Sequence, residues 1–186
     1  MKDFLKAIKP AVISIAIMTL LCGVIYTGIV TGLAQVIFPN QANGSIITVT
    51  LKDGTKKDYG SALIAQQFTK PGYLIGRPSG TTNLSTVSEE QKKLVQDRIT
   101  WWHNLDPENK ADIPMDLVTA SGSGVDPDIS PEAAEYQVER IARERGISQD
   151  EVRTMISKYT TGRFLGFWGE PAVNVLKVNL ALDGLL

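Results

Sequence analysis

The longest uninterrupted hydrophobic run in this chain lies near its start. Residues 11–38, 28 in number, include no Asp, Glu, Lys or Arg. A helix of that length rises about 42 Å, which exceeds the roughly 30 Å hydrocarbon core of a bilayer. Inside lipid the backbone polar groups have to bond to one another, so a single run of this kind is helical. The pattern therefore predicts one transmembrane helix over residues 11–38.

Charged residues on either side of this run indicate its orientation. Lysines at positions 2, 6 and 9 precede it, and no further lysine or arginine occurs before Lys52. The basic flank of a membrane helix stays in the cytoplasm. Residues 1–10 are therefore predicted to be cytoplasmic, and residues 39–186 to form one domain in the periplasm or outside the cell. The chain is then a single-pass protein of the cell membrane.

A cleaved signal peptide is the alternative interpretation of the same residues. The tripeptide Gly32-Leu33-Ala34 has the small residues that a signal peptidase requires, and a basic segment precedes the run. Signal peptides, however, have apolar regions of about 7–15 residues, much shorter than this one. We favour a retained anchor.

Small residues are grouped along the predicted membrane helix. Gly28 and Gly32 form a GxxxG pair, and Gly23, Thr27 and Thr31 lie near them at spacings of three and four. Such residues let two helix backbones approach closely in lipid. The alternative is that Gly is simply frequent in membrane helices. We favour the first interpretation and predict a partner helix.

Shorter patterns follow the anchor. Pro39–Gly44 should end the helix and form a hinge, and alternation over residues 46–51 predicts a strand with Asp53-Gly54 as its hairpin turn. Apolar residues at helical spacing predict a short helix over Ser61–Phe68. The Gly- and Pro-rich stretch Pro71–Ser85 is predicted to be a loop.

Helix-capping signals mark the C-terminal half. Ser88 and Gln91 are spaced as a capping box for a helix that runs toward His103, before a largely irregular stretch over 106–124. Ser130 and Gly146 are the natural start and stop of the next helix.

A further helix and a strand complete the domain. Ser148 and Glu151 form a second capping box, and the β-branched run 173–180 predicts a core strand. The chain is thus predicted to be α+β: a single N-terminal transmembrane helix followed by one extracytoplasmic α+β domain.

Composition narrows the function. The chain of 186 residues carries −1 in total; its first 38 residues carry +2, so the rest carries −3. A weakly acidic domain is a poor ligand for nucleic acid, which binds clustered basic surfaces. The sole cysteine, Cys22, lies in the membrane run, so the outer domain must be stabilised by packing without disulfides.

Few residues indicate catalysis or a metal site. The chain has one histidine, His103, too few ligands for a typical His/Cys metal centre, and no Gly-x-Ser-x-Gly motif accompanies it. We predict no catalytic residue and no metal. Trp101 and Trp102 precede this histidine and would suit a stacking platform for a ligand, although aromatic residues at a helix end more often face a core or a partner.

The stretch Thr119–Gly124 resembles a phosphate-binding loop but lacks its Gly-Lys-Ser/Thr ending. Asp126 and Asp128 follow, and their charge would repel phosphate. We favour a tight loop that caps the helix after Ser130; the alternative is a loop whose Ser121 and Ser123 contact a partner or ligand. Two carboxylates are too few for a typical site for a hard cation.

Arg77 lies in the loop Gly76-Arg77-Pro78-Ser79, where glycine and proline restrict the backbone. Its guanidinium is a rigid fork of donors suited to a carboxylate. That carboxylate belongs either to this domain or to a partner.

Four motifs occur in the order typical of a known family: 60–66 (GSALIAQ), 76–79 (GRPS), 118–127 (VTASGSGVDP) and 169–176 (GEPAVNVL). On these motifs the chain resembles the C subunits of Kdp potassium-transporting ATPases over nearly its whole length. It departs from the family pattern at Ala65, often Gly, and at Asp128, often His or Asn.

The resemblance implies a non-catalytic subunit of an ATP-driven, high-affinity potassium importer. Its expected partners are a channel-like potassium-selecting subunit, a P-type ATPase subunit that hydrolyses ATP, and a very small membrane subunit. The family's C subunit is described as a catalytic chaperone that raises the ATP affinity of the pump subunit. No cofactor is expected to be bound tightly.

The candidate residues for contact with a ligand such as ATP, or with a partner, are Gln66, Arg77, Ser121, Ser123 and Asp126. The lysine asymmetry places these residues outside the cell, whereas ATP is cytoplasmic, so an effect on ATP would have to pass through the membrane helices. The alternative function is a stand-alone anchored module that binds an extracellular ligand, and an enzyme ranks third.

Overall fold

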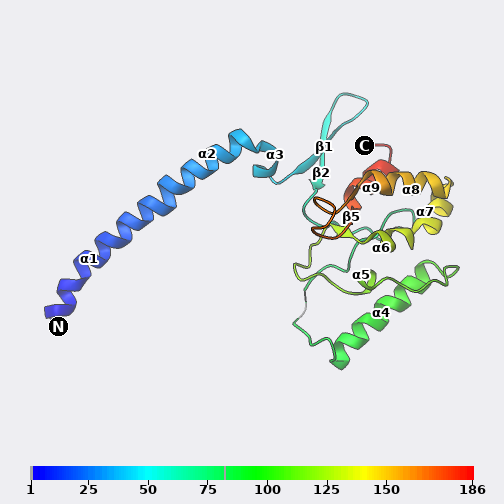
Figure 1. The fold of residues 1–186 in the computed structure, drawn as a ribbon, viewed down its shortest axis with the longest axis horizontal. Helices are drawn as coiled ribbons and strands as arrows, with labels where there is room; N and C mark the ends of the chain where they lie inside the picture. The colour runs from blue at the N-terminus through cyan, green and yellow to red at the C-terminus, as the bar shows by residue number, and fades with distance from the viewer. Residues whose placement is uncertain (1, 82) are drawn as a thin grey trace. The chain divides into compact units, whose positions relative to one another are not determined.

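The computed structural model describes residues 2–81 and 83–186. It divides into two compact units, Met1–Ile46 and Ile47–Leu186 (Figure 1). The first unit is mainly helical. The second combines helices with small sheets, so the predicted α+β class is confirmed.

The first unit is dominated by one long helix. Helix α1 (Lys2–Met18) leads into a π-helical segment, η1 (Thr19–Tyr26), and then into α2 (Thr27–Ile37). The stretch Lys6–Ile37 is long and apolar enough to cross a membrane, and none of it is buried. The hydroxyl of Thr27 donates to the carbonyl of Cys22, five residues earlier, over 2.8 Å. The small side of this helix is open, because nothing lies within 4 Å of a Cβ built on Gly28 or Gly32.

Backbone geometry ends the helix close to the predicted position. Phe38 leaves the helical region at φ −132°, and Pro39 then opens one further turn, α3 (Pro39–Ala42). Proline suits the first position of a helix because it lacks the amide hydrogen that would have no partner there. The predicted hinge therefore contains a short helix that the sequence did not indicate.

The hairpin predicted after the anchor is confirmed. Strands β1 (Ile46–Thr50) and β2 (Lys56–Ser61) form a two-stranded sheet. In the turn, the carboxylate of Asp53 accepts from the amide of Thr55 at 2.9 Å and from its hydroxyl at 2.6 Å, and Gly54 has φ +83°. These hydrogen bonds to the charged form lower the pKa of Asp53.

A second, three-stranded sheet lies in the core of the second unit. Strands β3 (Asp128–Ile129), β4 (Thr160–Thr161) and β5 (Ala172–Asn174) are antiparallel, in the order β3-β5-β4. Val173 of β5 pairs with Ile129 on one side and Thr160 on the other, and it is fully buried. This sheet joins segments that are far apart in the sequence.

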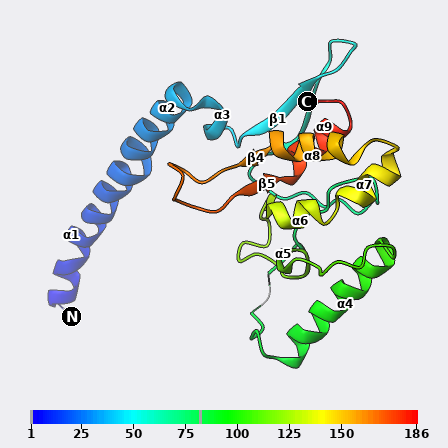
Figure 2. The same cartoon turned by 45° about the vertical axis from the view of Figure 1, so that its right-hand side comes forward.

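The described part of the second unit has six helices. They are α4 (Glu89–Leu105), α5 (Met115–Val118), α6 (Pro131–Glu135), α7 (Val138–Arg145), α8 (Gln149–Lys158) and α9 (Val175–Leu182). Of these, α6 and α9 contact β5, whereas α4 lies away from the sheet (Figure 2). Helix α4 packs on α5, α7 on α8, and α8 on α9.

The capping residues act mostly as predicted. The hydroxyls of Ser130 and Ser148 accept from the third residue of their helices, and Glu151 completes the second box by bonding back to Ser148. Gly146 ends α7 in the left-handed region at φ +66°. Ser88 caps α4, but the side-chain oxygen of Gln91 has no partner, so that capping box is only half formed.

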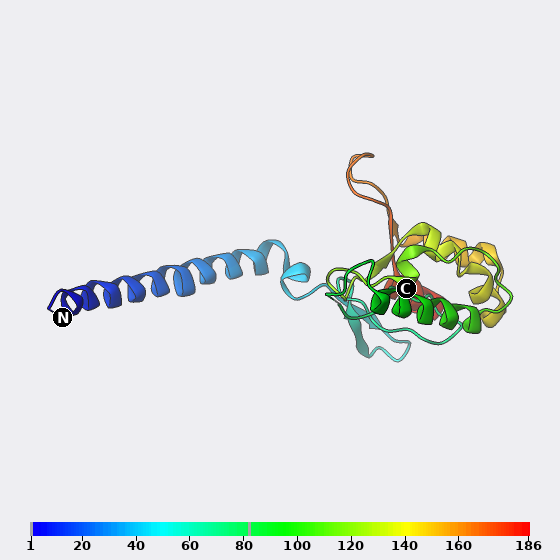
Figure 3. The same ribbon diagram turned by 90° about the horizontal axis from the view of Figure 1, so that it is seen from below.

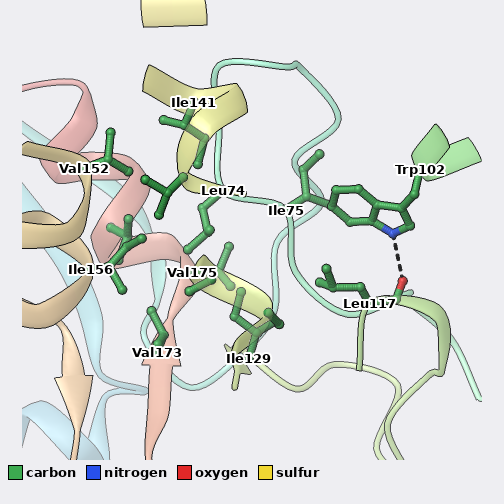
Figure 4. Close-up of a cluster of buried hydrophobic side chains, with 14 of the residues drawn as sticks. Leu74, Ile75, Trp102, Leu117, Ile129, Ile141, Val152, Ile156, Val173 and Val175 are labelled. Carbon is green, nitrogen blue, oxygen red and sulfur yellow. Dashed lines mark hydrogen bonds between the residues drawn. The ribbon is translucent and has the colours of Figure 1, made fainter. Parts of the chain in front are cut away.

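The hydrophobic core joins α6–α9, the three-stranded sheet and the loop before residue 76 (Figure 4). Leu74, Ile141, Val152 and Val173 have no exposed surface. Trp102 extends the core from α4, and its ring nitrogen donates to the carbonyl of Leu117 over 3.0 Å. Leu74 and Ile75 of the loop predicted over 71–85 thus lie in the core, where their backbone polar groups need partners.

Buried polar side chains bind the backbone of this loop. Asn179 accepts from the amide of Leu74 and donates to its carbonyl, both at 2.8 Å, and Gln137 bonds the amide and carbonyl of Ile75 in the same way, at 2.8 and 2.9 Å. Arg140 donates to loop carbonyls and to Gln137. Burial lowers the pKa of Arg140 to about 10, which leaves it charged at neutral pH.

The predicted helix over Ser61–Phe68 is wrong. Strand β2 continues to Ser61, whose hydroxyl then accepts from the amide of Leu63, and the chain remains irregular. Leu63 and Ile64 are exposed, so most of the predicted apolar face is not buried and cannot stabilise a helix. Apolar residues at helical spacing indicate a helix only where they pack against a core, and Leu63 and Ile64 do not.

The predicted strand over 173–180 is also wrong beyond Asn174. The side chain of Asn174 accepts from the amide of Lys177 and so starts α9 at Val175. Nearly every residue of this run is buried. When all faces are buried, apolar periodicity cannot separate strand from helix.

Two smaller differences concern helix continuity. The helix predicted from Ser130 to Gly146 is interrupted at Tyr136–Gln137, where the amide of Gln137 bonds to Ala134, three residues back. The stretch 106–124, predicted to be largely irregular, includes α5.

Candidate functional site

Four motif segments that are distant in the sequence meet in the second unit; we call this region the motif junction. Backbone hydrogen bonds join Ala65 to Val125 (2.8 Å) and Val175 to Pro127 (3.1 Å). The side-chain amide of Asn174 donates to the carbonyl of Ala62 over 2.9 Å. The 60–66, 118–127 and 169–176 motifs are therefore held directly against one another.

Arg77 connects the fourth motif to this junction. Its guanidinium lies 3.5 Å from the carboxylate of Asp126 and donates to the carbonyls of Thr119 (3.4 Å) and Ala120 (3.3 Å). Its Nε is buried and has no hydrogen-bond partner. The carboxylate predicted to pair with Arg77 thus belongs to the same domain.

Gln66 folds back over a glycine. Its side-chain amide donates to the carbonyl of Tyr59 over 2.9 Å, and a Cβ added to Gly60 would lie 1.5 Å from that amide nitrogen. Gly60 also has φ +132°, which side-chain-bearing residues rarely adopt. The glycine that opens the 60–66 motif thus makes room for the glutamine that closes it.

Ser121 and Ser123 stabilise their own turn. The hydroxyl of Ser121 accepts from the amide of Gly124 at 2.9 Å, and that of Ser123 accepts from the amide of Val125 at 3.2 Å. Gly124 is buried at φ +71°, and its carbonyl accepts from the amide of Gly80 over 3.0 Å. The Ser-Gly-Ser-Gly loop is therefore fixed to the segment that follows Arg77.

This loop does not cap the helix after Ser130, so that expectation is wrong. Ser130 caps that helix with its own hydroxyl, and Asp116, on α5, holds Ser130 in place: the carboxylate of Asp116 accepts from the amide of Ser130 at 2.7 Å and from its hydroxyl at 3.3 Å. The predicted loop lies against Gly80 instead. Nothing in the local sequence connects Asp116 with a residue fourteen positions later.

The two aspartates after the loop have different surroundings. Asp126 is paired with Arg77, whereas Asp128 accepts a hydrogen bond from Asn174 at 2.9 Å. Burial raises the pKa of Asp128; the hydrogen bond from Asn174 opposes this shift and the charge of Asp126 adds to it. Among the described residues, no group of three His, Cys, Asp or Glu side chains is placed to hold a metal ion.

A cavity of about 330 Å³ opens beside the junction. Gln66 and Arg77 line it together with Arg98 and the aromatic rings of Phe68 and Trp101. This volume lies at the lower end of the range for small-molecule sites. The structure thus brings Gln66 and Arg77 to one cavity, while Ser121 and Ser123 lie in the turn beside it.

Trp101 and Trp102 have different environments. Trp102 is buried and meets the ring of Trp101 edge to face, with centroids 5.2 Å apart. Trp101 is 40% exposed, and His103 is also exposed. The small residues Gly23, Thr27, Gly28, Thr31 and Gly32 belong to the first unit, whereas the motif junction is built from residues of the second.

Fold and site together define a class of protein: one helix able to span a membrane, joined to a single α+β domain whose distant loop motifs are bonded together. The family model for "K+-transporting ATPase, c chain" matches residues 8–184.

Curated relatives agree over the full length. A Potassium-transporting ATPase KdpC subunit from Listeria monocytogenes is 61% identical, covering 100% of this chain and 99% of the relative. Proteins of the same name from Clostridium perfringens and Methylococcus capsulatus are 49% and 47% identical, covering 98% and 95% of this chain and 99% and 97% of the relatives. The chain belongs to the KdpC family, the c chains of K+-transporting ATPases, and the resemblance drawn from the motifs is confirmed.

Proposed function

We propose that this chain is a non-catalytic accessory subunit that assembles and stabilises a potassium-importing ATPase. The observation that carries the proposal is the motif junction. Its polar groups bind neighbouring loops of the same domain: Arg77 bonds the 119–120 backbone, and Asn174 bonds Ala62. Such bonding suits a rigid domain that presents a surface to partners, and family membership makes the ATPase the assembly concerned.

The partners we propose are a channel-like potassium-selecting subunit, a P-type subunit that hydrolyses ATP, and a very small membrane subunit. The long apolar helix supplies the anchor, and its open small-residue side, at Gly28 and Gly32, suits close packing against a partner helix. The lysines before this helix favour a cytoplasmic N-terminus and an extracytoplasmic domain.

The proposed effect on ATP is that of a chaperone that raises the nucleotide affinity of the pump subunit. With the domain outside the cell, this effect requires two conformations of the complex that the subunit contacts differently. Direct nucleotide contact would use Gln66 and Arg77 at the cavity, with Ser121 and Ser123 nearby. Asp126, paired with Arg77 at 3.5 Å, would compete with a phosphate for the guanidinium. We therefore favour the indirect route.

A second candidate function, a stand-alone ligand-binding module, has one observation in its favour. The 330 Å³ cavity has an aromatic wall, to which the half-exposed Trp101 contributes. Apolar pockets with a few polar groups are the usual form of small-molecule sites. Ligand binding by the purified full chain, without any membrane partner, would favour this candidate.

The experiment that separates the two is purification of the tagged full-length chain from native membranes in mild detergent. The accessory-subunit proposal expects a P-type ATPase subunit and a channel-like subunit, identified by mass spectrometry, to co-purify in fixed proportion. A chain that emerges alone under several gentle conditions would contradict it. Potassium-stimulated ATP hydrolysis by the recovered complex provides the functional measurement.

A further inference from the structure

An apolar hairpin extends from the second unit between β4 and β5; we call residues 162–171 the hairpin arm. Figure 3 shows it in orange, projecting away from the body of this domain. Four large apolar side chains on it are almost fully open: Phe164 (69% exposed), Leu165 (72%), Phe167 (71%) and Trp168 (70%). No other short segment of the described second unit exposes so many large apolar residues in sequence.

The arm is an ordered structure. The amide of Phe164 donates to the carbonyl of Trp168 at 2.7 Å, and the reverse bond measures 2.9 Å. At the tip, Leu165 has φ +53° and Gly166 φ +81°. At the base, Arg163 and Glu170 form an ion pair at 2.7 Å. A loop with paired backbone loses little conformational freedom on binding, which favours affinity.

This arrangement indicates binding to another molecule. Exposed apolar patches bordered by polar residues mark interaction sites, and a leucine in the left-handed region is strained. The arm's aromatic residues are the types that dominate binding energy at protein interfaces. Within its own domain, the arm adds nothing to the hydrophobic core.

We propose that the hairpin arm inserts its aromatic tip into an apolar pocket on another subunit of the potassium-transporting ATPase. This inference rests on the proposed function, because it requires the chain to work within that complex. It assigns the contact to residues 164–168 and leaves the motif junction as the rigid base from which the arm projects.

Charge favours a protein pocket over a lipid surface. A groove of about 630 Å³ at the base of the arm is lined by one arginine, Arg77, and by five acidic residues: Asp116, Asp126, Asp128, Glu132 and Glu170. The domain beyond the anchor carries −3. Loops that bind anionic membranes gain affinity from clustered basic residues, and here the neighbouring surface is acidic.

The test compares two double variants of the full-length chain, each with an N-terminal tag, purified from native membranes. Phe164→Ser with Trp168→Ser removes two aromatic rings from the arm. Val87→Ser with Leu186→Ser is the control, since these apolar residues are also exposed. Each lost anchor should weaken association at least about tenfold, so we expect the arm variant to recover at least about tenfold less ATPase subunit than the control.

Thermal unfolding monitored by circular dichroism should be the same for both variants, because all four side chains are exposed. Equal recovery of partner subunits by the arm variant and the control would overturn the inference, while co-purification with the unaltered chain would still support the proposed function. If the unaltered chain recovers no ATPase subunit, both fail.

A photocrosslinking amino acid at Phe167 locates the contact without disturbing the fold. In intact membranes we expect a crosslinked product that contains this chain and one ATPase subunit, identified by mass spectrometry. The same probe at Val87 should give much less of it. Crosslinks to phospholipid alone, or equal yields at both positions, would contradict the protein pocket.

Discussion

Gly124 gives the sharpest test of how the motif junction is held together. It is buried with φ +71°, and a Cβ placed on it would lie 2.7 Å from the backbone carbon of Gly80 and 3.0 Å from its oxygen. The left-handed region costs a residue with a Cβ roughly 1–2 kcal/mol. Relief of the clash must move backbone that is bonded to Gly124, and overpacking of this kind costs about 1–3 kcal/mol. Gly124→Ala should therefore cost about 2–5 kcal/mol.

Gly146→Ala is the matched control. Its φ of +66° is nearly the same, but nothing lies within 4 Å of the added Cβ, so this variant should lose only the roughly 1–2 kcal/mol of backbone strain. Both full-length variants would be unfolded thermally in detergent and followed by tryptophan fluorescence. At about 2–4 °C per kcal/mol for a domain of this size, Gly124→Ala should melt several degrees below Gly146→Ala. Equal melting temperatures would refute the close approach of the two loops.

Three further predictions follow from contacts in the second unit and from the proposed topology. Because burial raises the pKa of Asp128, the folded state binds its proton more tightly, and stability is lost as pH rises through that pKa. Asp128→Asn should thus have a higher melting temperature than the unaltered chain at pH 7, and this difference should vanish below the ordinary aspartate pKa of 3.8. A difference in melting temperature that does not depend on pH would contradict this prediction. Gln137→Leu leaves the buried amide and carbonyl of Ile75 without partners, so it should lower the free energy of unfolding, measured with a chemical denaturant, by about 2–5 kcal/mol. The control, Gln96→Leu at an exposed position, should change stability by less than about 0.5 kcal/mol. Equal effects of the two variants would refute the role of Gln137. In a Cys22→Ala background, cysteine at exposed Ser157 should react with a membrane-impermeant maleimide in intact cells or spheroplasts; reaction only after permeabilisation would reverse the proposed topology.

Local signals in the sequence were reliable where they act over a few residues. Ser148 and Glu151 cap a helix, Gly146 ends one, and Asp53-Gly54 turns a hairpin, because each of these contacts joins near neighbours. The long uncharged run likewise predicts a helix, since inside lipid a single segment can satisfy its backbone polar groups only as a helix.

Predictions failed where tertiary contacts decide the structure. The run 173–180 is buried on nearly all sides, so its apolar pattern fits a strand as well as a helix, and the cap at Asn174 determines the outcome. Gln137 and Asn179 appear in the sequence as ordinary polar residues of amphipathic segments. Their role depends on a loop more than sixty residues earlier in the chain.

The candidate site shows the same division. The sequence identified Arg77, Ser121 and Asp126 as residues of interest but left the partner of Arg77 open. Only the fold brings Asp126 within 3.5 Å of it. The sequence does not predict the exposure of the hairpin arm, because large apolar residues such as Phe164 and Trp168 are also typical of a core strand. Their exposure is evident only in the folded structure.

We propose, as the central claim, that this chain is an accessory subunit that supports potassium-stimulated ATP hydrolysis by its partners. The most direct test measures potassium-stimulated ATP hydrolysis against ATP concentration, for complexes purified from cells with and without the chain. The account predicts less intact complex in its absence and a higher ATP concentration for half-maximal rate, both restored when the chain is supplied again. Equal yield of complex and an identical dependence on ATP with and without the chain would contradict it.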